Sequence, residues 1–192
     1  MNESRDKMIR ATITLLSERG YAGTSFGDVM AASGAPRGSI YHHFPGGKQQ
    51  LVAEAVARYA DGLAHRLRTA VQRGRSLDAV GLFIDAVRSG LRASDFTQGC
   101  AVAGVVLDIT PSESVLLDLT AQAFASWRHV LQTAFERDGV EPDRASRLAS
   151  FVVCAVEGAL VLARAERRLT PVDDVAHELT AHLTAALPAP GQ

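Results

Sequence analysis

A short polar segment between Pro36 and Phe44 contains side chains that could bind a nucleic acid. Wound as a helix at about 100° per residue, it places Pro36, Ile40 and Phe44 on one face. The opposite face carries a glycine and hydrogen-bonding side chains: Arg37, Gly38, Ser39, Tyr41 and His42. Such a face suits the major groove of DNA, where arginine can bind guanine through two hydrogen bonds. The pattern also fits a small helical corner whose polar face meets water, so geometry alone leaves both interpretations open.

The sequence lacks the residue patterns typical of catalytic or metal centres. Its six histidines include no HExxH motif and no i, i+4 pair, and there is no P-loop, GxGxxG or GxSxG segment. Cys100 and Cys154 are too far apart for a CxxC motif, and a small buried side chain is the favoured interpretation of Cys100. We therefore expect no enzyme activity, no cofactor and no metal.

Apolar residues recur at the helical period along almost the whole 192-residue chain, which predicts an all-α fold. Glycine and proline residues separate the predicted helices. Nine helices are predicted, over residues 4–19, 26–33, 36–43, 48–73, 77–93, 99–109, 112–138, 142–168 and 172–187. The second and third flank a turn centred on Gly34, which is the layout of a helix-turn-helix.

The first 50 residues resemble the DNA-binding region of the tetracycline-repressor (TetR) family of bacterial transcription regulators. The matching residues are Gly20-Tyr21, Thr24-Ser25, Asp28-Val29, Ala32, Gly34, Gly38–Phe44 and Lys48. The resemblance implies a nine-helix fold with a helix-turn-helix DNA-binding domain over residues 1–48 and an effector-binding and dimerisation domain over residues 49–192. Within the latter, residues 99–103 and 156–159 are similar to the LmrA/YxaF-like subgroup. Residues 45–47, Pro-Gly-Gly, depart from the pattern, since many relatives have a polar residue there.

The resemblance also implies DNA-contacting roles for individual residues. Contacts with the phosphate backbone are expected from Thr24, Ser25, Tyr41, His42 and Lys48. Contacts with base edges are expected from Arg37, Gly38 and Ser39. Hydroxyl groups and free N–H groups at a helix N-terminus favour phosphate binding. Residues 1–50 carry six basic and four acidic side chains (net +2), against 14 and 17 (net −3) in the remaining 142, so the charge asymmetry is mild.

The predicted helix over residues 142–168 is apolar on almost all sides between Leu148 and Ala163. Such a helix in a soluble protein must be covered all round. One face has small residues that permit close approach of a partner: Phe151, Ala155, Gly158 and Leu162. Leu179 and Leu183 on the last helix are further candidates. The family resemblance implies that these two helices form a four-helix interface in a homodimer, and burial within one monomer is the alternative.

A cavity for a small, apolar or aromatic effector among the fourth to eighth helices is also implied by the resemblance. The residues assigned to it are Tyr59, Phe83, Val106, Phe124, Trp127 and Glu157. Ordinary core packing is the alternative for the apolar ones. Glu157 interrupts an apolar run, and a buried carboxylate needs a partner, so a backbone group, a partner chain and an effector all remain open for it.

Together these features predict a homodimeric, effector-responsive regulator, most simply a repressor, that binds a double-stranded DNA operator. An activator of the same fold and a helical ligand-binding scaffold without DNA recognition are the alternatives. The N-terminus has charges of both signs and no apolar core, and no run of about 18 uncharged apolar residues occurs. We therefore expect a cytoplasmic protein with no membrane span.

Overall fold

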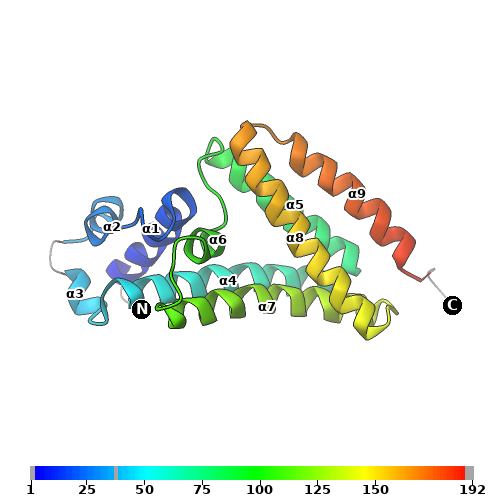
Figure 1. Cartoon of the computed structure of the whole chain (residues 1–192), viewed down its shortest axis with the longest axis horizontal. Coiled ribbons are helices and arrows are strands. Elements are labelled where there is room, and N and C mark those ends of the chain that lie inside the picture. The colour runs from blue at the N-terminus through cyan, green and yellow to red at the C-terminus, as the bar shows by residue number, and fades with distance from the viewer. Residues whose placement is uncertain (1–2, 37–38, 189–192) are drawn as a thin grey trace. The chain divides into compact units, whose positions relative to one another are not determined.

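The computed structural model describes residues 3–36 and 39–188 and confirms the all-α fold (Figure 1). Over those residues the chain forms nine helices and no strand. The helices are α1 (Glu3–Arg19), α2 (Phe26–Ser33), α3 (Ser39–His43), α4 (Gly47–Arg73), α5 (Ser76–Ala93), α6 (Ala101–Val106), α7 (Ser114–Arg137), α8 (Pro142–Glu166) and α9 (Thr170–Ala186). They follow the predicted order, and the differences lie at helix ends.

Residues with special backbone or capping properties set the ends of α1 and α2. Gly20 and Gly34 follow the two helices with φ angles of 71° and 66°, a left-handed conformation that glycine adopts without steric penalty. At the start of α2 the Ser25 side chain accepts a hydrogen bond from the N–H of Asp28 at 3.1 Å. The Asp28 carboxylate accepts one in return from the N–H of Ser25 at 3.0 Å, which completes a capping box.

The chain divides into two compact units. The first unit contains the residues up to Asp61 together with Gly99–Ala123, and the second contains Gly62–Gln98 and the residues from Phe124 onward. Both α4 and α7 contribute to each unit. This division does not correspond to one cut in the chain, so the domain boundary after residue 48 stays a prediction.

In the first unit, α6 packs against the end of α1 with very little space between the two backbones. A Cβ on Gly104 of α6 would lie 2.5 Å from the backbone oxygen of Leu16. The Gly104 carbonyl accepts a hydrogen bond from the N–H of Tyr21 at 3.1 Å, and the N–H of Gly99 donates to the Ser17 carbonyl at 2.7 Å. The close approach of α6 to α1 therefore depends on glycine at position 104.

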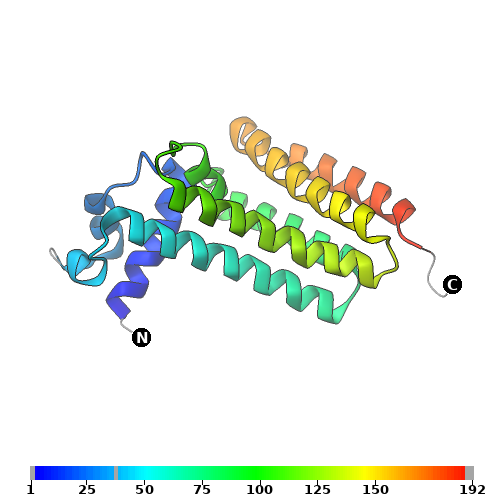
Figure 2. The same ribbon diagram turned by 60° about the horizontal axis from the view of Figure 1, so that its bottom comes forward.

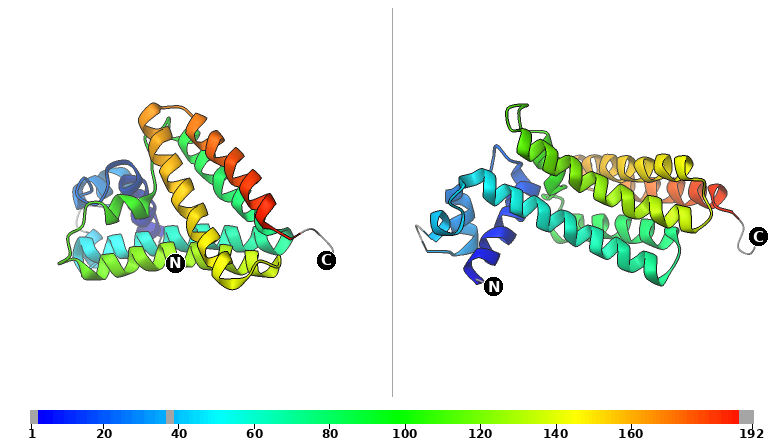
Figure 3. Two further views of the ribbon diagram at one scale, coloured as in Figure 1. Left: turned by 45° about the vertical axis from the view of Figure 1, so that its right-hand side comes forward. Right: turned by 90° about the horizontal axis from the view of Figure 1, so that it is seen from below.

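In the second unit, α5, α8 and α9 pack together. Figures 2 and 3 show α8 and α9 running side by side. The α8 residues that are buried within the chain include Leu148, Val152, Val156 and Ala159. Helices α5 and α9 are also joined by an ion pair between Arg88 and Asp173 at 2.8 Å.

A buried carboxylate holds the junction between α4 and α5. Asp138, which follows α7, accepts a hydrogen bond from the N–H of Ser76 at 2.7 Å and lies 3.3 Å from the guanidinium of Arg137. Arg137 in turn donates to the carbonyls of Val71 and Gly74 at 2.5 and 2.6 Å. Burial raises the pKa of Asp138, but the hydrogen bonds from Ser76 and Arg137 outweigh it and leave the pKa below its usual value.

Replacing Gly104 by alanine is expected to lower the free energy of unfolding by about 1–3 kcal/mol, because the backbone of α1 or α6 must shift to admit the Cβ. Gly90, which is exposed on α5, is a matched control, since a Cβ there would meet nothing within 4 Å. Gly90→Ala should stabilise by about 0.5–1 kcal/mol. Chemical denaturation of both variants measures the difference. Equal stabilisation by the two substitutions would contradict the close packing of α6 on α1.

Asp138 should make stability depend on pH. Because its pKa is lower in the folded state, its contribution is complete above the unfolded-state pKa and is lost as the pH falls below about 4. Asp138→Asn should lower the free energy of unfolding by about 1–3 kcal/mol at pH 7. On acidification, its free energy of unfolding should fall less than that of the wild type. Asp118→Asn, which removes an exposed carboxylate of α7, serves as the control and should change neither value. An unchanged acid dependence in Asp138→Asn would contradict this assignment.

Candidate nucleic-acid interface

The short helix α3 has one buried and one exposed face, as the sequence predicted. Ile40 and Phe44 are fully buried, whereas Tyr41 is 66% exposed and His42 is exposed. The prediction that Pro36 faces inward on the same helix is wrong, because Pro36 is exposed and α3 begins only at Ser39. The N–H and the hydroxyl of Ser39 both donate to the Pro36 carbonyl, at 3.1 and 2.8 Å.

Several aromatic side chains on and next to α3 contact one another. The Tyr41 ring meets the ring of Phe26, the first residue of α2, at a centroid distance of 5.4 Å and an interplanar angle of 81°. His43 is half-buried and its ring contacts the rings of both His42 and Phe44. Two predicted base-contacting residues, Arg37 and Gly38, lie outside the described residues.

Thr24 does not have the exposed hydroxyl that a phosphate contact requires. Its side chain is buried, with 2% exposure, and its hydroxyl donates to the carbonyl of Gly20 at 2.7 Å. The expectation that this hydroxyl contacts DNA is therefore corrected: it closes the turn after α1. The adjacent hydroxyl residue, Ser25, is the N-cap of α2.

Ser25 is exposed, but its hydroxyl already has partners in the free protein. The hydroxyl donates to the Asp28 carboxylate at 2.5 Å, and Arg19 lies 3.6 Å from the same carboxyl group. The hydrogen bonds from the side chain and N–H of Ser25, aided by Arg19, lower the pKa of Asp28. Ser25 therefore fixes the start of α2, and its role toward phosphate stays a prediction.

Lys48 at the start of α4 is half-buried against Tyr21. Its ammonium group donates to the Tyr21 carbonyl at 2.7 Å and lies 4.0 Å from the centre of the Tyr21 ring. Burial lowers the pKa of Lys48, and the negative charges of Glu113 and Asp108 offset part of that effect. The ammonium group therefore has a defined place beside the turn between α1 and α2, where the sequence predicted a phosphate contact.

Two acidic residues that the sequence reasoning missed hold the same turn. Asp108 accepts a hydrogen bond from the N–H of Ala22 at 3.0 Å. Burial is the main cause that raises the pKa of Tyr21, and a hydrogen bond with Glu113 raises it further. The Glu113 carboxylate also accepts a hydrogen bond from the N–H of Thr110 at 3.1 Å. The matching of Tyr21 to the family pattern was the only signal available, because Asp108 and Glu113 lie more than 80 positions away from this turn along the chain.

The structure brings together three of the six residues predicted to bind an effector. Trp127 lies at 5.3 Å from Phe124 and 6.1 Å from Phe83 between ring centroids, and both pairs are edge-to-face. Trp127 is fully buried in this cluster of the second unit. Tyr59 and Val106 belong to the first unit. Glu157 is half-exposed, so the expectation of a buried carboxylate is wrong for the single chain.

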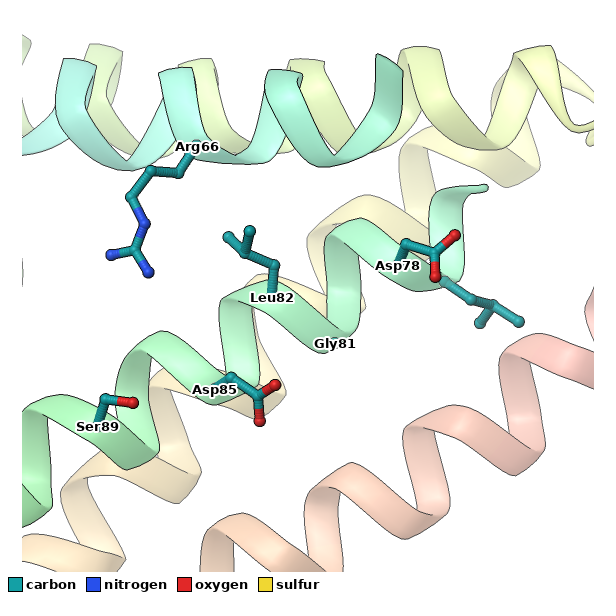
Figure 4. A pocket seen from close by; sticks show the side chains of 7 residues that line it. Arg66, Asp78, Gly81, Leu82, Asp85 and Ser89 are labelled. Atoms are coloured by element: carbon teal, nitrogen blue, oxygen red, sulfur yellow. The ribbon is translucent and has the colours of Figure 1, made fainter. Parts of the chain in front are cut away.

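A surface pocket of about 500 Å³ lies in the second unit beside α5 (Figure 4). Arg66 reaches toward it from α4, and the other lining residues belong to α5: Leu77, Asp78, Gly81, Leu82, Asp85 and Ser89. None of the residues predicted to bind an effector lines this pocket, so their role in effector binding stays a prediction.

The outer face of α8 is apolar and exposed in the single chain. Phe151 and Leu162 are 49% and 54% exposed, Gly158 is exposed and Ala155 is half-buried. Leu179 and Leu183 of α9 are instead buried within the chain, so their assignment to a dimer interface is corrected. The reason is that the apolar stripe of α9 packs against α5 and α8 of the same unit.

On length and composition alone, α8 could cross a membrane, and it is the one such helix within the described part of the chain. In its most apolar stretch, 44% of the residues are buried by the rest of the protein. Core helices of soluble proteins have the same properties, so this feature is weak support for a membrane span.

Comparisons with known proteins identify the class. The family described as "Bacterial regulatory proteins, tetR family" matches residues 8–55, and "Transcriptional regulator LmrA/YxaF-like, C-terminal domain" matches residues 76–178. The chain is 37% identical over 193 residues, and 98% of each chain, to the uncharacterized HTH-type transcriptional regulator MT0206 of Mycobacterium tuberculosis (strain CDC 1551 / Oshkosh).

Solved structures show the same fold. A TetR transcriptional regulator from Legionella pneumophila matches with a TM-score of 0.83 and 20% identity, over 95% of this chain and 98% of that one. A cysteine mutant of the TetR family regulator CifR, complexed with 26 bp double-strand operator DNA, matches with a TM-score of 0.73 and 21% identity, over 90% and 94%. The protein is thus a helix-turn-helix transcriptional regulator and not an enzyme. It belongs to the TetR family, and its C-terminal region is of the LmrA/YxaF-like type.

Proposed function

We propose that this regulator is a cytoplasmic homodimer that binds a two-fold symmetric DNA operator, represses transcription there, and is released by a small apolar or aromatic effector. The carrying observation is the exposed face of α3, where Tyr41 and His42 point away from the buried Ile40 and Phe44. An activator of the same fold is the alternative, because the position of the operator decides the sign of regulation. A ligand-binding scaffold that does not recognise DNA is a second alternative.

In the proposed complex, α3 lies in the major groove. Tyr41 and His42 bind the phosphate backbone from α3, and Lys48 does so from the start of α4. Arg37, Gly38 and Ser39 approach the base edges, where Arg37 can bind guanine through two hydrogen bonds. CifR, a protein of the same fold, was solved in complex with double-strand operator DNA, which supports DNA binding by this fold. Phosphate contacts by Lys48 and its neighbours would make the affinity depend on salt.

The exposed apolar face of α8 supports the proposed homodimer. Phe151, Gly158 and Leu162 lie on a helix whose opposite face is already buried by α5 and α9. A second copy of the same face, related by a two-fold axis, would cover these residues. Dimerisation would also supply two recognition helices, which must be spaced by about 34–36 Å or a multiple to reach two half-sites.

The aromatic cluster around Trp127 supports an effector of apolar or aromatic character. Edge-to-face contacts with Phe83 and Phe124 form a buried apolar cluster of polarisable rings in the second unit. An effector that binds there can release DNA only if it has higher affinity for a conformation in which the two recognition helices are wrongly spaced. For Tyr59, Val106 and Glu157, a contact with an effector stays a prediction.

Alanine substitutions on α3 test the DNA complex. Tyr41→Ala should weaken binding about tenfold on every DNA sequence, because a backbone contact carries no sequence information. Arg37→Ala should weaken binding and also relax the preference for one base pair. Mobility shifts on the DNA upstream of the protein's own gene, at several salt concentrations, measure both effects. Arg128→Ala, which removes an exposed arginine of α7, is the control for charge. If Tyr41→Ala and Arg37→Ala both bind like the wild type, this docking mode is wrong.

A charge on the outer face of α8 tests the dimer. Leu162→Glu should convert the dimer to monomers in sedimentation experiments and reduce operator affinity by at least tenfold, because an unpaired carboxylate would be buried at the interface. Leu107→Glu, at an 80% exposed position after α6, is the matched control and should leave the dimer intact. A dimer of undiminished stability in Leu162→Glu would exclude this face as the interface.

A further inference from the structure

Tyr41 is an exposed side chain whose ring nevertheless has a specific neighbour. With 66% of its surface exposed, burial does little to restrict its rotamers. Its ring meets Phe26 of α2 in an edge-to-face contact, with centroids 5.4 Å apart and planes at 81°. We propose that Phe26 is a positioning residue for DNA binding, which holds the Tyr41 phenol in the orientation that meets a backbone phosphate. This inference rests on the proposed contact between Tyr41 and DNA.

Phe26 can serve as a fixed support because the start of α2 is rigidly defined. It directly follows the N-cap Ser25, whose side chain and N–H take part in the capping box with Asp28. The next turn of α2 is anchored by Val29, which is fully buried. Phe26 itself is half-buried. Its ring therefore has a set position relative to the first turn of α2.

The opposite side of the contact is held just as firmly at the backbone. Ile40 and Phe44 flank Tyr41 in the chain and are fully buried, so the backbone of α3 cannot rotate without exposing them. The freedom that remains at position 41 is that of the side chain. A ring contact with Phe26 restricts that freedom before DNA arrives, and a preordered side chain loses less entropy on binding.

The Phe26–Tyr41 contact also links the two helices of the motif on their outer surface. Ser25, at the N-terminus of α2, and Tyr41, on α3, are both predicted to bind phosphate groups. Because Phe26 follows Ser25 directly, its contact with Tyr41 ties the position of one predicted phosphate contact to that of the other. Two contacts at a fixed separation match neighbouring phosphates better than two that move independently.

Four variants and a double variant test the proposal through the dissociation constant for the upstream DNA duplex, measured by fluorescence anisotropy at one salt concentration. Phe26→Ala should weaken binding about 3- to 10-fold, the range expected for an aromatic pair. Phe26→Tyr, which keeps the ring, should bind within twofold of the wild type. Phe26→Leu removes the ring but keeps most of the apolar volume. It should therefore also weaken binding about 3- to 10-fold, and it provides the test if Phe26→Ala folds poorly.

The double variant distinguishes positioning from an independent role. If Phe26 acts through Tyr41, adding Phe26→Ala to Tyr41→Ala should cause no further loss of affinity. Additive losses would overturn the proposal, since Phe26 would then contact DNA itself or act only on stability. Wild-type affinity in both Phe26→Ala and Phe26→Leu would overturn it as well. If Tyr41→Ala alone binds DNA normally, the proposed Tyr41 contact fails first, and the positioning role fails with it.

Discussion

The burial of Ile40 and Phe44 is the constraint on which the interface depends. A helix of five residues is unstable by itself in water, so α3 exists because these two side chains are buried in the first unit. Phe44 is covered on one side by the guanidinium of Arg5, which lies 5.1 Å from its ring centre and pairs with Glu54. Arg5 of α1 thus links Phe44, which directly follows α3, to Glu54 of α4. Tyr41 and His42 are exposed as a direct consequence.

A segment from the middle of the chain completes the support of this motif. The stretch between Gly99 and Glu113 includes α6 and contacts the end of α1 and the following turn through Gly104, Asp108 and Glu113. That turn carries Tyr21, which holds Lys48, and leads into the cap of α2. The helix-turn-helix is therefore not stabilised by its own three helices alone. The residues proposed to contact phosphate depend on backbone positions that a distant part of the sequence fixes.

Much of this architecture could be predicted from local sequence patterns. The helical period, the glycines after α1 and α2, and the two faces of α3 all depend on residues close together in the chain, and the structure agrees with them. The errors concern the choice between two local options. Thr24 and Ser25 are equally good caps by type, and only the carbonyl of Gly20 decides that Thr24 turns inward.

The remaining differences arise from contacts between distant residues. An apolar stripe such as that of Leu179 and Leu183 fits a partner chain as well as the chain's own α5 and α8, and the sequence does not state which is nearer. The hydrogen bond from the N–H of Ala22 to Asp108 also could not be predicted, because the two residues are 86 positions apart in the chain. For Glu157 the error has the opposite direction. The apolar run around it suggested burial, but its side of α8 is partly exposed in the single chain.

Dimethyl sulfate interference on the bound upstream DNA tests the central claim most directly, because it reports which groove the protein occupies. The account predicts that methylation of guanine N7, in the major groove, prevents binding at two symmetric clusters whose centres are one helical turn or a multiple apart. Interference limited to adenine N3 in the minor groove, or to a single unsymmetric cluster, would contradict it.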